Sequence, residues 1–116
     1  MTTKEAYEIF GGNYDEVIER LGTDSLIVRF FGKFKEDDSM EKLVDAVEKG
    51  DIEQSFRAAH TLKGVAANLS MTNLANAASN LTEQLRDRSN TADEQLFQAV
   101  KIAYAQVIDV IDAFEA

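Results

Sequence analysis

The amino-acid sequence predicts an all-α protein, and three observations support this fold class. The chain of 116 residues contains no proline and only six glycines. It is rich in Ala, Leu, Glu, Lys and Gln, the residues with the highest helix propensity. Apolar residues recur every three or four positions along most of the chain, as on one face of a helix. We therefore expect an antiparallel up-down four-helix bundle with short N-terminal helices packed against it.

The first expected elements are two short helices at the N-terminus. Thr2 and Glu5 have the spacing of a capping box, and Gly11 is a suitable residue to end the helix that they begin. Residues 14–21 carry a second short apolar stripe. Helices of this length are marginal on their own, so residues 1–23 are expected to form a brace that packs on a larger body.

That body, residues 24–116, is predicted to contain four helical arms joined by short loops, and the whole chain to form a single domain. The first arm extends to Gly50, but its apolar stripe changes sides near Ser39, where we expect a break or a kink with Ser39 as a new N-cap. The capping-box spacing of Thr91 and Glu94 predicts the start of the last arm. The second, third and fourth arms are expected at about residues 52–69, 74–88 and 91–114.

Composition and charge exclude several classes of function. With 21 acidic and 12 basic residues, the formal net charge is −9, which argues against binding to nucleic acid or to an anionic membrane surface. The chain has no cysteine and one histidine, so disulfides, thiolate metal sites and a di-iron carboxylate site are not expected. No apolar run reaches the length of a membrane span or a signal peptide, and we expect a cytoplasmic protein without a metal site.

The one histidine, His60, stands out on the second arm. On a helical wheel it lies away from the apolar stripe, with Arg57 and Gly64 on the same ridge and Lys63 one turn further on. A glycine inside a helix costs about 1 kcal/mol relative to alanine, so Gly64 suggests that something approaches this spot closely. Gly64 and Ala67 together would form a flat ledge beside the imidazole.

This arrangement suits a nucleophile that receives a phosphoryl group and passes it on. An exposed imidazole is largely unprotonated near neutral pH and can attack an electrophile. Lys63 and Arg57 could then stabilise the negative charge of the phosphoryl group. For Arg57, a plain surface ion pair with Glu53 is an equally good interpretation.

Residues 59–64, A-H-T-L-K-G, match the H-x-[LI]-K-G signature of histidine phosphotransfer (HPt) domains of bacterial two-component phosphorelays. Residues 30–51 resemble the helix and Gly-Asp turn that precede this signature in the family, and residues 69–81 resemble the helix that follows it. The resemblance covers about residues 24–116.

The resemblance implies a phosphorelay intermediate. His60 would accept a phosphoryl group from a phospho-aspartate of a response-regulator receiver domain, or within a histidine kinase relay, and pass it to another receiver. Lys63 would stabilise the phosphoryl group, and Gly64 would provide steric clearance. The receiver would supply the catalytic carboxylates and Mg²⁺, so the resemblance implies a carrier rather than an enzyme, with no cofactor of its own. The expected partners are receiver domains and possibly a hybrid histidine kinase.

The sequence departs from the family pattern at three positions. The family often has glycine where this chain has Ala67 and Ser70, and it tends to place an amide or a carboxylate where this chain has Thr82, with Glu83 next to it. A threonine can form a hydrogen bond but cannot hold a charge. We expect Arg57, Ala67 and Thr82 to lie at the partner-binding surface.

Two other functions compete with phosphotransfer. The altered positions would suit an adaptor that binds a receiver or kinase domain without carrying phosphate. An enzyme with His60 as a general base has the least support, since the sequence offers no partner carboxylate at a fixed spacing and no phosphate loop. The start at Met1 and the lack of a flanking linker favour a free-standing protein, which we expect to be a monomer. The direction of transfer depends on the partners.

Overall fold

The computed structural model describes residues 1–115, which contain seven α-helices and no strand. The predicted all-α class is therefore confirmed. The helices are α1 (Thr3–Phe10), α2 (Tyr14–Leu21), α3 (Asp24–Glu36), α4 (Ser39–Lys49), α5 (Ile52–Asn68), α6 (Thr72–Leu85) and α7 (Glu94–Glu115).

The predicted capping signals are correct at the start of the chain and wrong before α7. The Thr2 side chain accepts a hydrogen bond from the Glu5 backbone N–H at 3.1 Å, and the Glu5 carboxylate accepts one from the Thr2 backbone at 3.0 Å. At α7 the cap is Asp93 rather than Thr91, because the Asp93 carboxylate accepts the backbone N–H of Leu96 at 2.9 Å. The last helix therefore begins later than its sequence signal suggests.

The first arm breaks where the apolar stripe changes sides, as predicted. Helix α3 ends at Glu36 and α4 begins at Ser39. The predicted cap at Ser39 is wrong, because the Ser39 backbone N–H lies inside α4 and donates to the Asp37 carboxylate at 3.0 Å. Residues 37–38 thus let Phe34 and Met40 both enter the core from two differently oriented helices.

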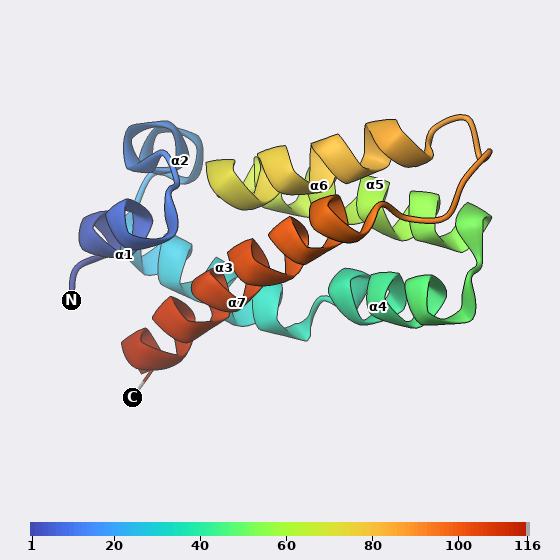
Figure 1. Ribbon diagram of the computed structural model, residues 1–116. Helices are drawn as coiled ribbons and strands as arrows, with labels where there is room; N and C mark the ends of the chain where they lie inside the picture. The colour runs from blue at the N-terminus through green and yellow to red at the C-terminus, as the bar shows by residue number, and fades with distance from the viewer. Residues whose placement is uncertain (116) are drawn as a thin grey trace.

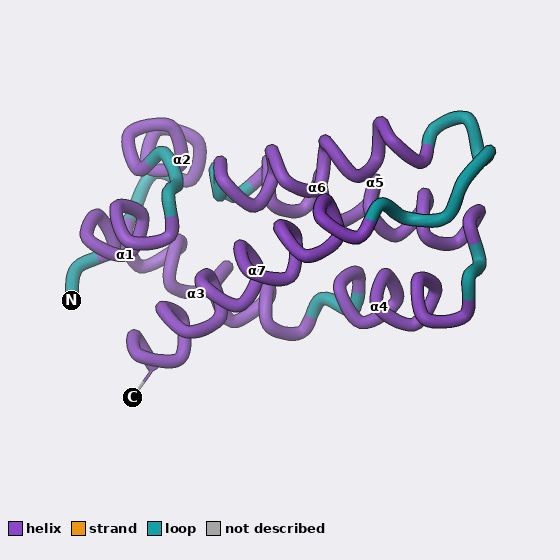
Figure 2. The backbone as a smooth tube through the Cα atoms, in the orientation of Figure 1, coloured by secondary structure: helices purple, strands orange, loops and turns teal. Residues whose placement is uncertain are grey.

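Successive helices from α4 to α7 reverse direction, so each runs opposite to its predecessor (Figure 1). Helix α5 packs between α4 and α6, and α7 packs on α6 before it crosses to reach α1 and α3. Figure 2 shows that the helices are joined by short loops, of which the longest, residues 86–93, connects α6 to α7. One core receives a buried side chain from every described helix: Ala6, Val17, Ile27, Leu43, Leu62, Leu81 and Val107.

The N-terminal helices share this core. Tyr7 and Phe10 are almost fully buried, and their rings lie 6.0 and 6.3 Å from the ring of Phe31 in α3. The Tyr7 hydroxyl donates a hydrogen bond to the backbone carbonyl of Leu69 at 2.7 Å. Residues 1–23 are therefore attached to the end of α5 as well as to α3. None of the helices in the described range is long and apolar enough to cross a membrane.

Candidate functional site

Helix α5 presents His60 to solvent because its opposite side is anchored in the core. Asp51 caps the start of the helix, because its carboxylate accepts the backbone N–H of Gln54 at 3.0 Å. Ala59, Leu62 and Ala66 are fully buried, whereas His60 is exposed. The separation of these residues on the helical wheel is the one that the sequence predicted.

The imidazole of His60 stacks on Phe56, one turn earlier in α5. The two ring planes differ by only 9°, and their centroids lie 6.0 Å apart, which describes an offset parallel stack. Side chains in a helix lean toward its N-terminus, so position i naturally meets position i−4. The sequence pattern indicates Phe56 only as an apolar position of this helix, although its i−4 spacing from His60 could have revealed the contact.

The loop between α6 and α7 brings two arginines to the same aromatic ring. The guanidinium carbon of Arg88 lies 3.6 Å from the centroid of Phe56, and that of Arg86 lies 5.5 Å from it. No local sequence signal indicates these contacts, because both arginines lie in the loop that follows α6, far along the chain from Phe56. The site therefore extends beyond the residues that the sequence singled out.

Glu53 joins Arg57 to this cluster. Its carboxylate accepts hydrogen bonds from Arg88 at 2.9 Å and from Arg57 at 2.8 Å. These two partners, Arg88 first, hold the pKa of the Glu53 carboxyl below its ordinary value of 4.5. The surface ion pair that the sequence offered as the second interpretation of Arg57 is thus present, and its solvent exposure limits its contribution to stability.

Lys63 is half-buried, and within residues 1–115 it has no ion-pair partner and no hydrogen-bond acceptor. The charge of Lys63 acts on the carboxyl of Glu83. A hydrogen bond from Arg86 is the main cause that lowers the pKa of the Glu83 carboxyl, and the charges of Lys63 and His60 lower it further. The ammonium of Lys63 is therefore available for an anion that arrives beside His60.

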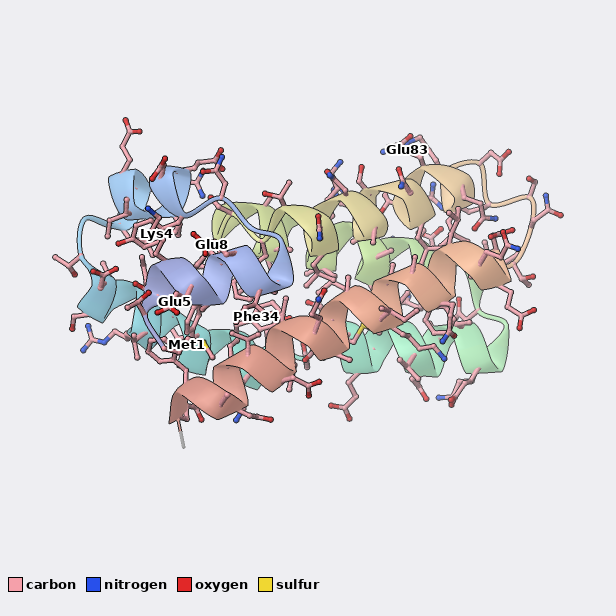
Figure 3. All side chains as sticks on the ribbon, turned by 60° about the vertical axis from the view of Figure 1, so that its left-hand side comes forward. Met1, Lys4, Glu5, Glu8, Phe34 and Glu83 are labelled. Carbon is pink, nitrogen blue, oxygen red and sulfur yellow. The ribbon has the colours of Figure 1, made fainter. Side chains whose placement is uncertain are left out.

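Glu83 lies on the outer side of α6, near the end that leads into the loop before α7 (Figure 3). Its carboxylate is held by two hydrogen bonds from Arg86, at 2.7 and 2.9 Å. This bidentate geometry is the strong form of an arginine–carboxylate pair. Both carboxylate oxygens of Glu83 therefore accept a hydrogen bond from Arg86.

Gly64 and Ala67 are both exposed on α5, as the predicted ledge requires. A Cβ atom built on Gly64 would meet no atom within 4 Å. Packing within the chain therefore does not require a glycine at this position.

Thr82 does not lie at the surface. Its side chain is fully buried, and its hydroxyl donates to the backbone carbonyl of Ala78 at 2.7 Å. The structure thus leaves Thr82 no exposed surface for a partner to contact. One residue further along α6, Glu83 points outward, since neighbouring positions on a helix are about 100° apart.

Ser70 lies in the left-handed backbone region, with a φ of 53°, and it is almost fully buried. Its hydroxyl donates to the Glu16 carboxylate at 2.8 Å and accepts from Arg20 at 3.2 Å. Arg20 also donates to the backbone carbonyls of Asn68 and Ala67, at 2.5 and 3.2 Å. Helix α2 therefore caps the C-terminal end of the helix that carries His60.

Among residues 1–115, no group of three or more His, Cys, Asp or Glu side chains could hold a metal ion. The groove between α4 and α5 is lined by charged residues of both signs, such as Lys42 with Asp38 and Lys49 with Asp45, which pair with each other. The exposed His60 is the feature that distinguishes the solvent-facing side of α5.

The fold and this surface define a helical domain that exposes a single histidine one turn before a lysine without an ion-pair partner among residues 1–115. Residues 30–112 match the Hpt domain family, and the chain belongs to that family. The matched region contains His60, Lys63 and Gly64 and leaves the first two helices outside it. The chain shows no significant match to a curated protein or to a solved structure. Hpt domains take part in histidine-containing phosphotransfer in two-component signalling, in which they interact with receiver domains and histidine kinases.

Proposed function

We propose that this protein is a phosphorelay intermediate that accepts a phosphoryl group on His60 from a phospho-aspartate of a receiver domain and passes it to another receiver. The observation that carries the proposal is the exposed position of His60, the single histidine of a chain in the Hpt family. The half-buried Lys63 and the open space above Gly64 support it.

The chemical step requires little from the protein itself. A ring nitrogen of neutral His60 attacks the phosphorus of the aspartyl phosphate. The new P–N bond forms as the P–O bond to the aspartate breaks, and the aspartate leaves as a carboxylate. The proton on the other ring nitrogen stays on the imidazolium that results. Lys63, and Arg57 at longer range, stabilise the charge of the phosphoryl group.

The partner supplies the remaining components. A receiver domain contributes the carboxylates and the Mg²⁺ that hold the phosphoryl group during an in-line displacement. The protein thus acts as a carrier, without a cofactor of its own, and works as a monomer whose antiparallel bundle holds His60 toward each partner in turn. Gly64 and Ala67 let the partner reach the imidazole, and Arg57 lies at the edge of the contact.

A non-phosphorylated adaptor is the second candidate, and one observation favours it. Thr82 occupies the position where the family tends to place a polar group oriented at the histidine, and its side chain is buried and bonded to Ala78. An adaptor would bind a receiver or a kinase domain through the same surface without transfer.

A phosphotransfer assay separates the two functions. The protein is mixed with phosphorylated receiver domains and Mg²⁺, and acid-labile, base-stable phosphate is measured on it. We expect label on the wild type, none on His60→Gln, and transfer slowed about tenfold or more by Lys63→Gln. Label that persists in His60→Gln would place the site elsewhere. Receivers that bind without transferring would favour the adaptor.

A further inference from the structure

The stack beneath His60 extends from α5 into the loop between α6 and α7. Phe56 lies parallel to the imidazole, and the guanidinium of Arg88 lies over the Phe56 ring at 3.6 Å from its centroid. At this distance a guanidinium plane both stacks on an aromatic ring and is attracted by its electrons. Arg88, Phe56 and His60 thus form a connected series of contacts, which we call the His60 support.

The backbone of Arg88 adopts a conformation that needs compensation. Its φ is 56°, in the left-handed region, which costs a residue other than glycine about 1 kcal/mol or more. Three contacts hold it there: its side chain donates to Glu53 at 2.9 Å and to the backbone carbonyl of Arg86, and its backbone N–H donates to Leu85 at 3.0 Å. The loop is therefore shaped so that the Arg88 guanidinium reaches Phe56.

An exposed histidine needs such a support if its orientation matters. A free side chain has three staggered wells at χ1 and roughly two orientations of the ring, so about six arrangements are open to it. Attack on phosphorus needs the ring nitrogen to point at the donor, and orientation contributes directly to rate. In this chain Thr82 is turned into the core, and within residues 1–115 the His60 ring makes no hydrogen bond.

We propose that Phe56 and Arg88 are positioning residues that fix the orientation of the His60 imidazole, so that the α6–α7 loop supports the nucleophile from below. This inference rests on the proposed phosphotransfer function. Phe56 selects the rotamer of His60 by stacking, and Arg88 holds the ring of Phe56 in place. Releasing the imidazole to all of its orientations lowers the productive fraction by up to about sixfold.

The test uses a small phosphoryl donor, phosphoramidate, which needs no docking surface. Its P–N bond breaks with release of ammonia as the new P–N bond to the imidazole forms. Because the chain has one histidine, His60→Gln gives the background. The variants are Phe56→Leu, which keeps an apolar side chain without a ring, Phe56→Tyr, which keeps the ring, and Arg88→Gln. The matched control is Lys101→Gln, which removes a second cation, 4.9 Å from the ring of Phe97 in α7.

We expect Phe56→Leu and Arg88→Gln to react with phosphoramidate about two to six times more slowly than the wild type. Phe56→Tyr and Lys101→Gln keep the wild-type rate within a factor of about two. The same order holds for transfer from a phosphorylated receiver. A second measurement follows the NMR signals of the His60 ring protons. They shift in Arg88→Gln, although that variant keeps both rings, because the imidazole changes its orientation relative to Phe56. A loss of stability alone would not move the signals of the folded protein.

Three outcomes overturn the inference. Unchanged rates together with unchanged ring-proton signals show that the support does not position His60. Slower transfer from the receiver with unchanged reactivity toward phosphoramidate shows that Phe56 and Arg88 contact the partner instead. If Phe56→Tyr, which keeps a ring, reacts as slowly as Phe56→Leu, the effect comes from packing of the phenylalanine side chain and not from stacking on the imidazole. If the wild type accepts no phosphoryl group from any donor, the proposed function fails, and the NMR comparison still decides whether the support orients the ring.

Discussion

Replacement of Gly64 by alanine should make the protein more stable and slow phosphotransfer, so this one substitution tests both effects. The residue lies inside α5, and a Cβ added to it would meet no atom within 4 Å. Alanine loses less backbone conformational entropy than glycine when a helix forms. The substitution should therefore stabilise the folded state by about 0.5–1 kcal/mol. For a domain of this size the midpoint of thermal unfolding rises by roughly 2–6 °C.

In the proposed function, the same methyl group would occupy the space through which a receiver approaches His60. We expect Gly64→Ala to slow transfer from a phosphorylated receiver by up to about tenfold. Gly64→Gln should slow it by about 100-fold, because a displacement of about 1 Å at a reacting centre has effects of this size. Thermal melts followed by circular dichroism give the stability, and single-turnover transfer gives the rate.

Gly32 provides the matched control. It lies inside α3, and an added Cβ there would also meet nothing within 4 Å. Gly32→Ala should raise the unfolding midpoint by a similar amount, and neither Gly32→Ala nor Gly32→Gln should change the transfer rate. Wild-type transfer by Gly64→Gln would refute the clearance role. A lower unfolding midpoint for Gly64→Ala would refute the account based on helix propensity.

Three further predictions concern the supports of α5 and the charges near His60. Arg20→Ala should lower the free energy of unfolding in urea by about 1–2 kcal/mol, since it removes charge-assisted hydrogen bonds to the end of α5. The control Lys42→Ala, at an exposed ion pair, should change it by less than about 0.5 kcal/mol. Equal effects of the two substitutions would contradict the capping role of Arg20. Burial raises the pKa of the Tyr7 hydroxyl above its ordinary value of 10.0, so its contribution to stability is complete below pH 10.0 and declines as the pH rises further. Tyr7→Phe should lower the free energy of unfolding by about 1–2 kcal/mol at neutral pH and should weaken the loss of stability above pH 10.0. A variant that melts like the wild type at neutral and at alkaline pH would contradict the Tyr7–Leu69 hydrogen bond. Arg86 holds the pKa of Glu83 below 4.5, so the stabilising effect of the ionised carboxyl is present above pH 4.5 and is lost as the pH falls through the lowered value; in Arg86→Gln the carboxyl should titrate closer to 4.5 by ¹³C NMR, and an unchanged midpoint would exclude Arg86 as the main cause.

Local signals in the sequence predicted the features that depend on local contacts. The capping box of Thr2 and Glu5 needs only a spacing of three residues, and it forms. The predicted cap at Thr91 fails because a residue from another helix competes for this loop. Gln84 donates to the Thr91 carbonyl at 3.0 Å and accepts the backbone N–H of Asp93 at 2.8 Å, which fixes the start of α7 at the later position.

The candidate site divides along the same line. The side of α5 that carries His60 and Gly64 follows from the helical period alone, and both residues are exposed. The approach of Arg88 to Phe56 depends on where α6 ends and how its loop turns, which no spacing encodes. The orientation of Thr82 depends on the rotation of α6 against the core, and a rotation of one position exchanges a buried threonine for an exposed glutamate.

The first two helices lie outside the region matched by the family, yet they complete the end of the helix that carries His60. Carbonyl groups at the C-terminus of a helix lack partners within it. Arg20 from α2 and the Tyr7 hydroxyl from α1 supply donors to carbonyls of residues 67–69. Ser70 then turns the chain with a left-handed backbone that glycine adopts at lower cost, and its hydroxyl bonds to Glu16 and Arg20 compensate for that cost. Because serine stands where the family often has glycine, the contacts from α2 and the altered turn belong together. A substitution in the α2 contacts should therefore alter the turn at Ser70, and a substitution at Ser70 should alter the α2 contacts. Either change should reach His60 through α5.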